Sequence, residues 1–140
     1  MLFRLLCNNC FLCLLTKRGK KRYNLQLMSN LSWPYTYETR HVAISDGVLF
    51  LPDLLDDYDQ FIFPAWEEIF NNSNPIAIEY CSGNGAWIVE KALENPGINF
   101  VAVEKKFDRV RKIHGRMKRM GVTNLFIVYG EGLRFTKEYV

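Results

Sequence analysis

The sequence predicts an α/β fold built on a small parallel sheet. Three short apolar segments suited to strands alternate with two segments suited to helices; the strands are expected over 76–80, 98–103 and 125–129. Nearly all-apolar strands are typical of a parallel sheet with helices on both faces. The β-α-β-α-β order, with right-handed crossovers, therefore predicts a Rossmann-like, three-layer αβα arrangement with a mostly parallel sheet.

Two shorter elements precede this unit. A hairpin is expected over 41–51, because Asp46-Gly47 separates two apolar runs and this dipeptide favours a two-residue turn. Pro64 predicts the start of a short helix over 65–70, since proline suits the first helical turn.

The two crossover helices have recognisable ends. The first is expected over 86–94 and stops at Asn95-Pro96-Gly97. The second covers 107–120 and ends at Gly121, a residue suited to the end of a helix. His114 lies in the second helix, where a surface or edge role is expected.

Composition and cysteine placement narrow the class of protein. A chain of 140 residues suits one domain, and an apolar content of 49% argues against disorder. Three of the four cysteines cluster near the N-terminus and the fourth is Cys81. This pattern does not resemble a secreted disulfide framework, so a cytoplasmic location is expected. The cluster has no histidine or second cysteine group nearby, and no metal site is expected.

The N-terminal segment is interpreted as an extension. Residues 1–15 are apolar but fall short of the roughly 20 residues that span a bilayer. Basic residues follow this stretch, whereas a secretory signal carries them before it, so no membrane partner is expected. The predicted organisation is an extension over 1–30, poorly ordered, a lead-in over 31–75, and a βαβαβ half domain over 76–140.

Acidic residues and glycines at the strand ends predict a ligand site. Glu79 closes the first strand, and an unpaired carboxylate is costly to bury as core. Gly83 and Gly85 follow, as a backbone requires when it turns tightly beside a ligand. Glu104 closes the second strand and Glu131 follows the third. The carboxyl ends of parallel strands meet at one edge, which predicts a nucleotide-type cofactor site there.

The motifs for pyrophosphate-containing cofactors are missing. A G-x-G-x-x-G pattern started at Gly83 fails at Ile88, and no GxxxxGK[ST] is present. S-adenosylmethionine contains adenosine and a cationic methionine tail but no phosphate, and it fits this pattern. Glu104 lies about 20 residues after Gly85, where an acid can accept from both ribose hydroxyls. Glu79 would add negative potential near the cationic groups, and Glu131 could accept from the adenine amino group.

The segment from about Trp66 to Val140 resembles the bacterial tRNA (guanine-N7-)-methyltransferases, a branch of the class I methyltransferases. The matching features are Ile78-Glu79-x-Cys81-Ser82-Gly83-Asn84-Gly85, Asn99 to Glu104, Arg109-Val110 and Gly121 to Leu125. The resemblance implies S-adenosylmethionine as methyl donor, N7 of a guanine in the tRNA variable loop as acceptor, and donor contacts from Glu79, Glu104 and Glu131. The family usually has glycine at position 81 and aspartate at position 131.

The resemblance covers the donor half of the family and none of the acceptor half. The family's guanine-binding aspartate and its Pro-Trp-x-Lys-x-Arg-His type segment have no match, so no catalytic residue is assigned. The family sheet normally has seven strands. Because only three strands are predicted here, we expect a form truncated after the third core strand. Its first strand would lie at an open edge of the sheet, where an unpaired apolar strand favours aggregation, and the stability of the chain should be low.

A basic run predicts the partner. Residues 105–119 contain eight lysines and arginines and one acid, Asp108. Such a cluster can bind RNA phosphates, although a solvated helix face is the other interpretation. The resemblance favours tRNA. The alternative functions are a non-catalytic Rossmann-like module that binds a nucleotide or RNA, and a small-molecule methyltransferase.

Overall fold

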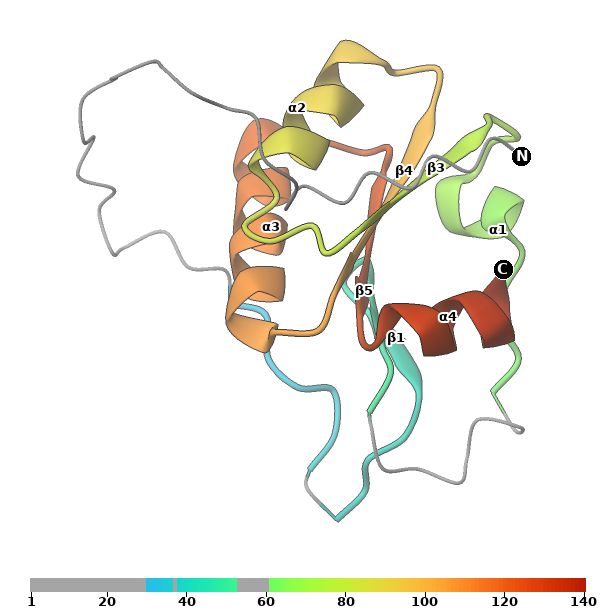
Figure 1. The fold of residues 1–140 in the computed structure, drawn as a ribbon, viewed down its shortest axis with the longest axis vertical. Helices are drawn as coiled ribbons and strands as arrows, with labels where there is room; N and C mark the ends of the chain where they lie inside the picture. The colour runs from blue at the N-terminus through green and yellow to red at the C-terminus, as the bar shows by residue number, and fades with distance from the viewer. Residues whose placement is uncertain (1–29, 37, 53–60) are drawn as a thin grey trace, which may run out of the picture.

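The computed structural model describes residues 30–36, 38–52 and 61–140. Expectations for the N-terminal extension and its three cysteines concern residues outside these ranges. Within them, the helices and strands form an α/β arrangement with a central twisted sheet (Figure 1).

The described residues form one five-stranded sheet in the order β1-β2-β5-β4-β3. The pairs β2–β5, β5–β4 and β4–β3 are parallel, and only β1–β2 is antiparallel. The strands are β1 (Ala43–Ser45), β2 (Val48–Phe50), β3 (Ile76–Tyr80), β4 (Asn99–Glu104) and β5 (Leu125–Tyr129). The mostly parallel sheet is confirmed, and β3 lies at its edge as expected.

The expectation of three strands was wrong, because the hairpin joins the sheet. Its turn forms at the predicted dipeptide: Asp46 and Gly47 have φ of 48° and 76°, the conformation of a type I′ turn. All three residues of β2 are buried, and β2 pairs with β5, with Val48 opposite Ile127. This pairing joins segments far apart in the sequence, and local periodicity carries no information about such a contact.

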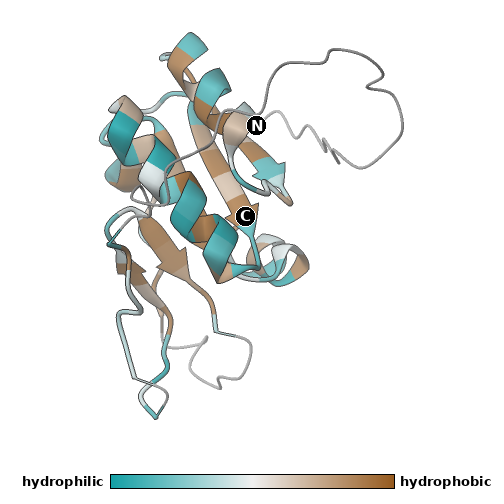
Figure 2. Cartoon of the chain, turned by 90° about the vertical axis from the view of Figure 1, so that its left-hand side faces the viewer, coloured by the Kyte–Doolittle hydropathy of each residue, from teal (hydrophilic) through white to brown (hydrophobic). Residues whose placement is uncertain are grey.

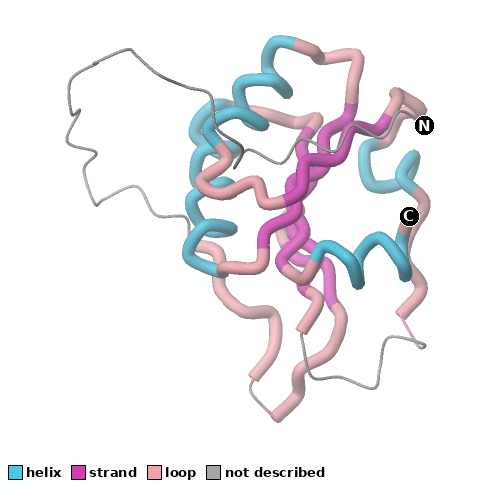
Figure 3. The backbone as a smooth tube through the Cα atoms, viewed as in Figure 1, coloured by secondary structure: helices cyan, strands magenta, loops and turns pink. Residues whose placement is uncertain are grey.

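Helices cover both faces of the sheet, which confirms the three-layer prediction. Figures 1 and 3 show α2 and α3 on one side of the strands and α1 and α4 on the other. Their bounds are α1 (Trp66–Phe70), α2 (Ala86–Glu94), α3 (Phe107–Met120) and α4 (Gly132–Tyr139). Gly121 ends α3 in the left-handed conformation, as predicted. The sequence reasoning did not predict α4.

Each face of the sheet has its own apolar core. Alternate residues of β4 divide between the two: Ala102 belongs to the core under α2 and α3, whereas Val101 and Val103 belong to the core under α1 and α4. Figure 2 shows hydrophobic strands between helices that carry both polar and apolar residues. This division follows from the two-residue period of a strand, which turns successive side chains to opposite faces of the sheet.

Candidate functional site

The carboxyl ends of β3, β4 and β5 lie at one edge of the sheet, and a pocket opens there. Its volume is about 580 Å³, within the range of about 300–1,000 Å³ usual for small-molecule sites. The pocket, called here the edge pocket, is lined by Ile78, Tyr80, Cys81, Val103, Glu104, Lys105, Lys106, Arg109, Gly130, Glu131, Gly132, Leu133 and Thr136. It combines an apolar floor with two acids and three cations.

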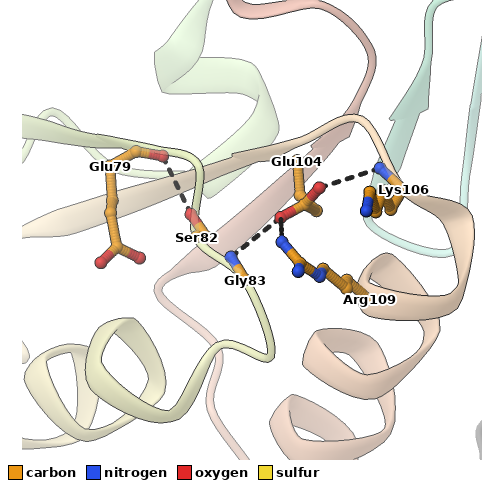
Figure 4. Close-up of polar contacts among 6 residues, drawn as sticks. All are labelled: Glu79, Ser82, Gly83, Glu104, Lys106 and Arg109. Atoms are coloured by element: carbon orange, nitrogen blue, oxygen red, sulfur yellow. Dashed lines mark hydrogen bonds and ion pairs between the residues drawn. The ribbon is translucent and has the colours of Figure 1, made fainter. Parts of the chain in front are cut away.

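Glu104 is held rigidly at this edge. It is the last residue of β4 and only 4% exposed. Its Oε2 accepts from the Gly83 amide at 3.0 Å and from Arg109 Nη1 at 3.5 Å, and its Oε1 accepts from the Lys106 amide at 2.9 Å (Figure 4). Because a carboxylate has about four acceptor positions, Oε1 keeps capacity for a ligand donor.

Glu131 lies in the same pocket as Glu104 and begins α4. Its Oε2 accepts from the Arg134 amide at 2.9 Å, a side-chain cap on the helix. That hydrogen bond, with a second from the Leu133 backbone, lowers the pKa of the exposed carboxyl. Glu131 therefore carries its charge at neutral pH and faces the pocket from the α4 side.

Glu79 lies on the other side of the glycine loop from Glu104 (Figure 4). It is only 5% exposed, and its Oε2 has no hydrogen-bond partner among the described residues. Burial raises the pKa of this carboxyl. Glu79 lines a second pocket of about 830 Å³ beside β3 and α2, together with Trp87 and Glu94. The structure thus brings Glu104 and Glu131 into one pocket, but not Glu79.

Three residues of the loop after β3 have positive φ: Cys81 at 60°, Gly83 at 58° and Gly85 at 69°. A Cβ on Gly85 would lie 2.7 Å from Ile113 Cγ1, so only glycine lets the loop pack against α3. Cys81 carries a side chain in the same conformation at a cost of about 1–2 kcal/mol. This geometry explains why glycine suits position 81.

Sequence reasoning missed the contribution of α4. Leu133 and Thr136 line the edge pocket from this helix, and Thr136 Oγ1 lies 2.6 Å from the hydroxyl of Tyr80. The signal was present, because Gly132, Phe135, Thr136 and Tyr139 recur at helical spacing.

His114 does not have the expected surface role, because it is only 3% exposed. Its Nε2 donates to the carbonyl of Asp46 at 3.2 Å and lies 3.0 Å from Asp46 Oδ2. Burial lowers the pKa of the imidazole. Lys118 also pairs with Asp46, so α3 holds the tip of the hairpin. Helical periodicity could not reveal this, because the partner belongs to a distant turn.

Within the described ranges, no group of three or more His, Cys, Asp or Glu residues is arranged to hold a metal ion. No helix in the same part of the chain is long and apolar enough to cross a membrane.

Comparison with known proteins identifies the family. A family model described as "Putative methyltransferase" matches residues 73–140. The tRNA (guanine-N(7)-)-methyltransferase of Chlamydia caviae is 50% identical over 111 residues, which cover 79% of this chain and 50% of the relative. The chain belongs to the tRNA (guanine-N(7)-)-methyltransferase family.

More distant members of this methyltransferase family match as well. The enzyme of that name from Geobacter metallireducens is 32% identical over 102 residues, or 72% of this chain and 46% of the relative. The one from Staphylococcus aureus is 35% identical over 88 residues, or 63% and 41%. The chain spans about half the length of the curated relatives it matches.

Proposed function

We propose that this chain binds S-adenosylmethionine in the edge pocket and serves the methylation of tRNA guanine at N7. The observation that carries the proposal is that Glu104 and Glu131 line one largely apolar pocket at the carboxyl edge of the sheet, in a chain of this methyltransferase family. The proposal keeps the predicted domain organisation, with 76–140 as the donor-binding unit, 31–75 as a lead-in and 1–30 as an extension.

The donor fits the chemistry of the pocket. Glu104, fixed by two backbone amides, would accept from the ribose hydroxyls, and Glu131 from the adenine amino group. Ile78 and Val103 provide apolar surface for the adenine ring. Gly83 and Gly85 shape the loop beside the methionine portion. Glu79, behind that loop, would contribute negative charge toward the cationic groups.

The chemistry asks little of the protein beyond alignment. When bound, S-adenosylmethionine supplies an electrophilic methyl group, and guanine N7 already has a free lone pair. The residues of the site therefore need to bind and orient, and no general base is required. Accordingly we assign Glu79, Gly83, Gly85, Glu104 and Glu131 to donor binding and no residue to catalysis.

The outer surface of α3 supports RNA as the partner. Six of its basic residues, or those just before it, are exposed: Lys105, Lys106, Arg109, Lys112, Lys118 and Arg119. Because Lys105, Lys106 and Arg109 also line the edge pocket, the positive surface extends to the donor site. RNA phosphates would bind here with an affinity that falls as salt rises. A cytoplasmic location, where tRNA is found, belongs to this proposal.

Calorimetry with S-adenosylhomocysteine tests the donor site without requiring an acceptor. Wild-type protein should bind, and Glu104→Gln should lose about 10- to 150-fold in affinity, because hydrogen bonds to a charged group contribute about 1.5–3 kcal/mol. Glu94→Gln is the matched control, since Glu94 is an exposed acid outside the edge pocket. Failure of the wild type to bind at high protein concentration would refute the donor site.

A second assay tests the acceptor. Any methyl transfer from labelled S-adenosylmethionine to a tRNA transcript should disappear when the variable-loop guanine is replaced by 7-deazaguanine, which lacks the N7 lone pair. Methylation that persists on the 7-deaza transcript would contradict the proposed acceptor atom. RNA binding without donor binding would instead favour a non-catalytic RNA-binding module.

A further inference from the structure

An exposed tryptophan packs on residues that are next in sequence to the lining of the edge pocket. Trp33 is 43% exposed, although it contacts four aromatic rings. Its indole stacks on Phe107, with ring centroids 4.1 Å apart and planes 21° apart, and it meets Tyr129 edge-on at 5.0 Å. These contacts fix the indole in place while leaving much of its surface open to solvent.

The contacts of Trp33 also locate it relative to the pocket and to the charges. Phe107 directly follows Lys105 and Lys106, and Tyr129 directly precedes Gly130; both lysines and the glycine line the edge pocket. Lys105 and Lys106 are exposed. Trp33 is therefore an exposed aromatic ring packed on residues that are adjacent in sequence to two exposed lysines and to the lining of the edge pocket.

Exposed aromatic rings combined with cationic side chains bind single-stranded nucleic acid, because bases stack on the ring while the cations attract the phosphates. We propose that Trp33 stacks on an unpaired RNA base beside the donor pocket, with Lys105 and Lys106 holding the adjacent phosphates. The inference rests on the proposed function for its choice of RNA. It goes further by assigning an acceptor-side contact to the lead-in segment, which supplies none of the donor-pocket residues.

The alternative is that Trp33 only covers the core. If Trp33 only covers the core, its replacement should lower stability and should affect the binding of single-stranded and double-stranded RNA equally. The two roles therefore predict different results when binding to a 12-nucleotide oligoadenylate is compared with binding to a 12-base-pair RNA duplex, whose bases are already stacked.

Fluorescence anisotropy without donor measures this. Trp33→Leu should weaken oligoadenylate binding by about 5- to 150-fold, the usual effect of losing one base–aromatic stack, and leave duplex binding unchanged. Trp33→Phe should retain most of the affinity. Trp87→Leu is the control, because Trp87 is similarly exposed, at 37%, but lies with Glu79 and Glu94 in the second pocket. Equal losses from Trp33→Leu and Trp87→Leu, or equal losses on duplex, would overturn the proposal.

Two further measurements keep the test decisive. In a protein with Trp66→Phe and Trp87→Phe, Trp33 is the one tryptophan left. Stacking of a base on Trp33 should quench its fluorescence when oligoadenylate is added, and unchanged fluorescence would contradict the stacking. S-adenosylhomocysteine should bind the Trp33→Leu variant as it binds wild type. If wild type itself fails to bind that ligand, the donor site is refuted, while the RNA result still decides the role of Trp33.

Discussion

Gly85 offers a sharp test of how the glycine loop is held in place. It has φ of 69°, precedes α2, and its amide donates to the carbonyl of Ser82 at 3.0 Å. An alanine there would place its Cβ 2.7 Å from Cγ1, 3.0 Å from Cγ2 and 3.1 Å from Cβ of Ile113. Gly85→Ala thus adds both backbone strain and a clash with α3.

The two costs can be separated. A side chain in the left-handed region costs about 1–2 kcal/mol, and overpacking of a buried contact costs about 1–3 kcal/mol. The expected loss in free energy of unfolding is their sum, about 2–5 kcal/mol. Gly83→Ala is the control: Gly83 also has positive φ, but its added Cβ would meet only the Cys81 carbonyl oxygen, at 3.9 Å, so only about 1–2 kcal/mol is expected.

Urea denaturation followed by circular dichroism gives both values. Adding Ile113→Ala to Gly85→Ala should cost less than the sum of the two single changes, because it removes the two closest atoms. Equal losses for Gly85→Ala and Gly83→Ala, or strictly additive losses in the double variant, would refute the claim that packing against Ile113 demands glycine.

Three further predictions concern single residues. Burial raises the pKa of Glu79, so the native state keeps a proton that the unfolded chain releases, and stability should fall as pH rises above about 4.5. In urea unfolding at pH 7, the Glu79→Gln protein should be more stable than wild type by about 1–2 kcal/mol. The same pH dependence of stability in both proteins would contradict the assignment to Glu79. Burial lowers the pKa of His114, so the unfolded chain takes up the proton first as pH drops, and stability should fall, by at most about 1.4 kcal/mol per pH unit, below about pH 6.5. The urea denaturation midpoint should vary less between pH 5 and 7 in His114→Gln than in wild type. An equal pH dependence of the midpoint in both proteins would exclude His114 as its cause. Relief of strain at Cys81 by Cys81→Gly, offset by the entropy of glycine, should raise stability by roughly 0.5–1 kcal/mol, and a lower melting temperature would argue against strain at this position.

The donor-side elements were predictable because their signals are local. The strand β3, the crossover helices α2 and α3 and the strand β5 matched their predicted ranges, and β4 was shifted by one residue. Apolar runs, glycine stops and the Asp46-Gly47 turn each act within a few residues. The position of Glu104 and Glu131 at one edge followed from the parallel order alone.

The remaining features depend on contacts between distant segments. The hairpin pairs with β5, His114 reaches Asp46, and Trp33 stacks on Phe107. None of these pairs shares a periodic pattern in the sequence. The separation of Glu79 from Glu104 also depends on the path of the loop, which residue types alone do not specify.

The sequence by itself determined most of the strands, helices and turns, with α4 the exception, because backbone preference and apolar period act over one or two turns of chain. It also determined which acids end the strands. Only the tertiary structure decided which acids share a pocket, which histidine is buried and which tryptophans stay exposed. Those outcomes depend on how layers of side chains pack between segments far apart in the sequence, such as β2 and β5, and packing is a property of the assembled sheet and helices.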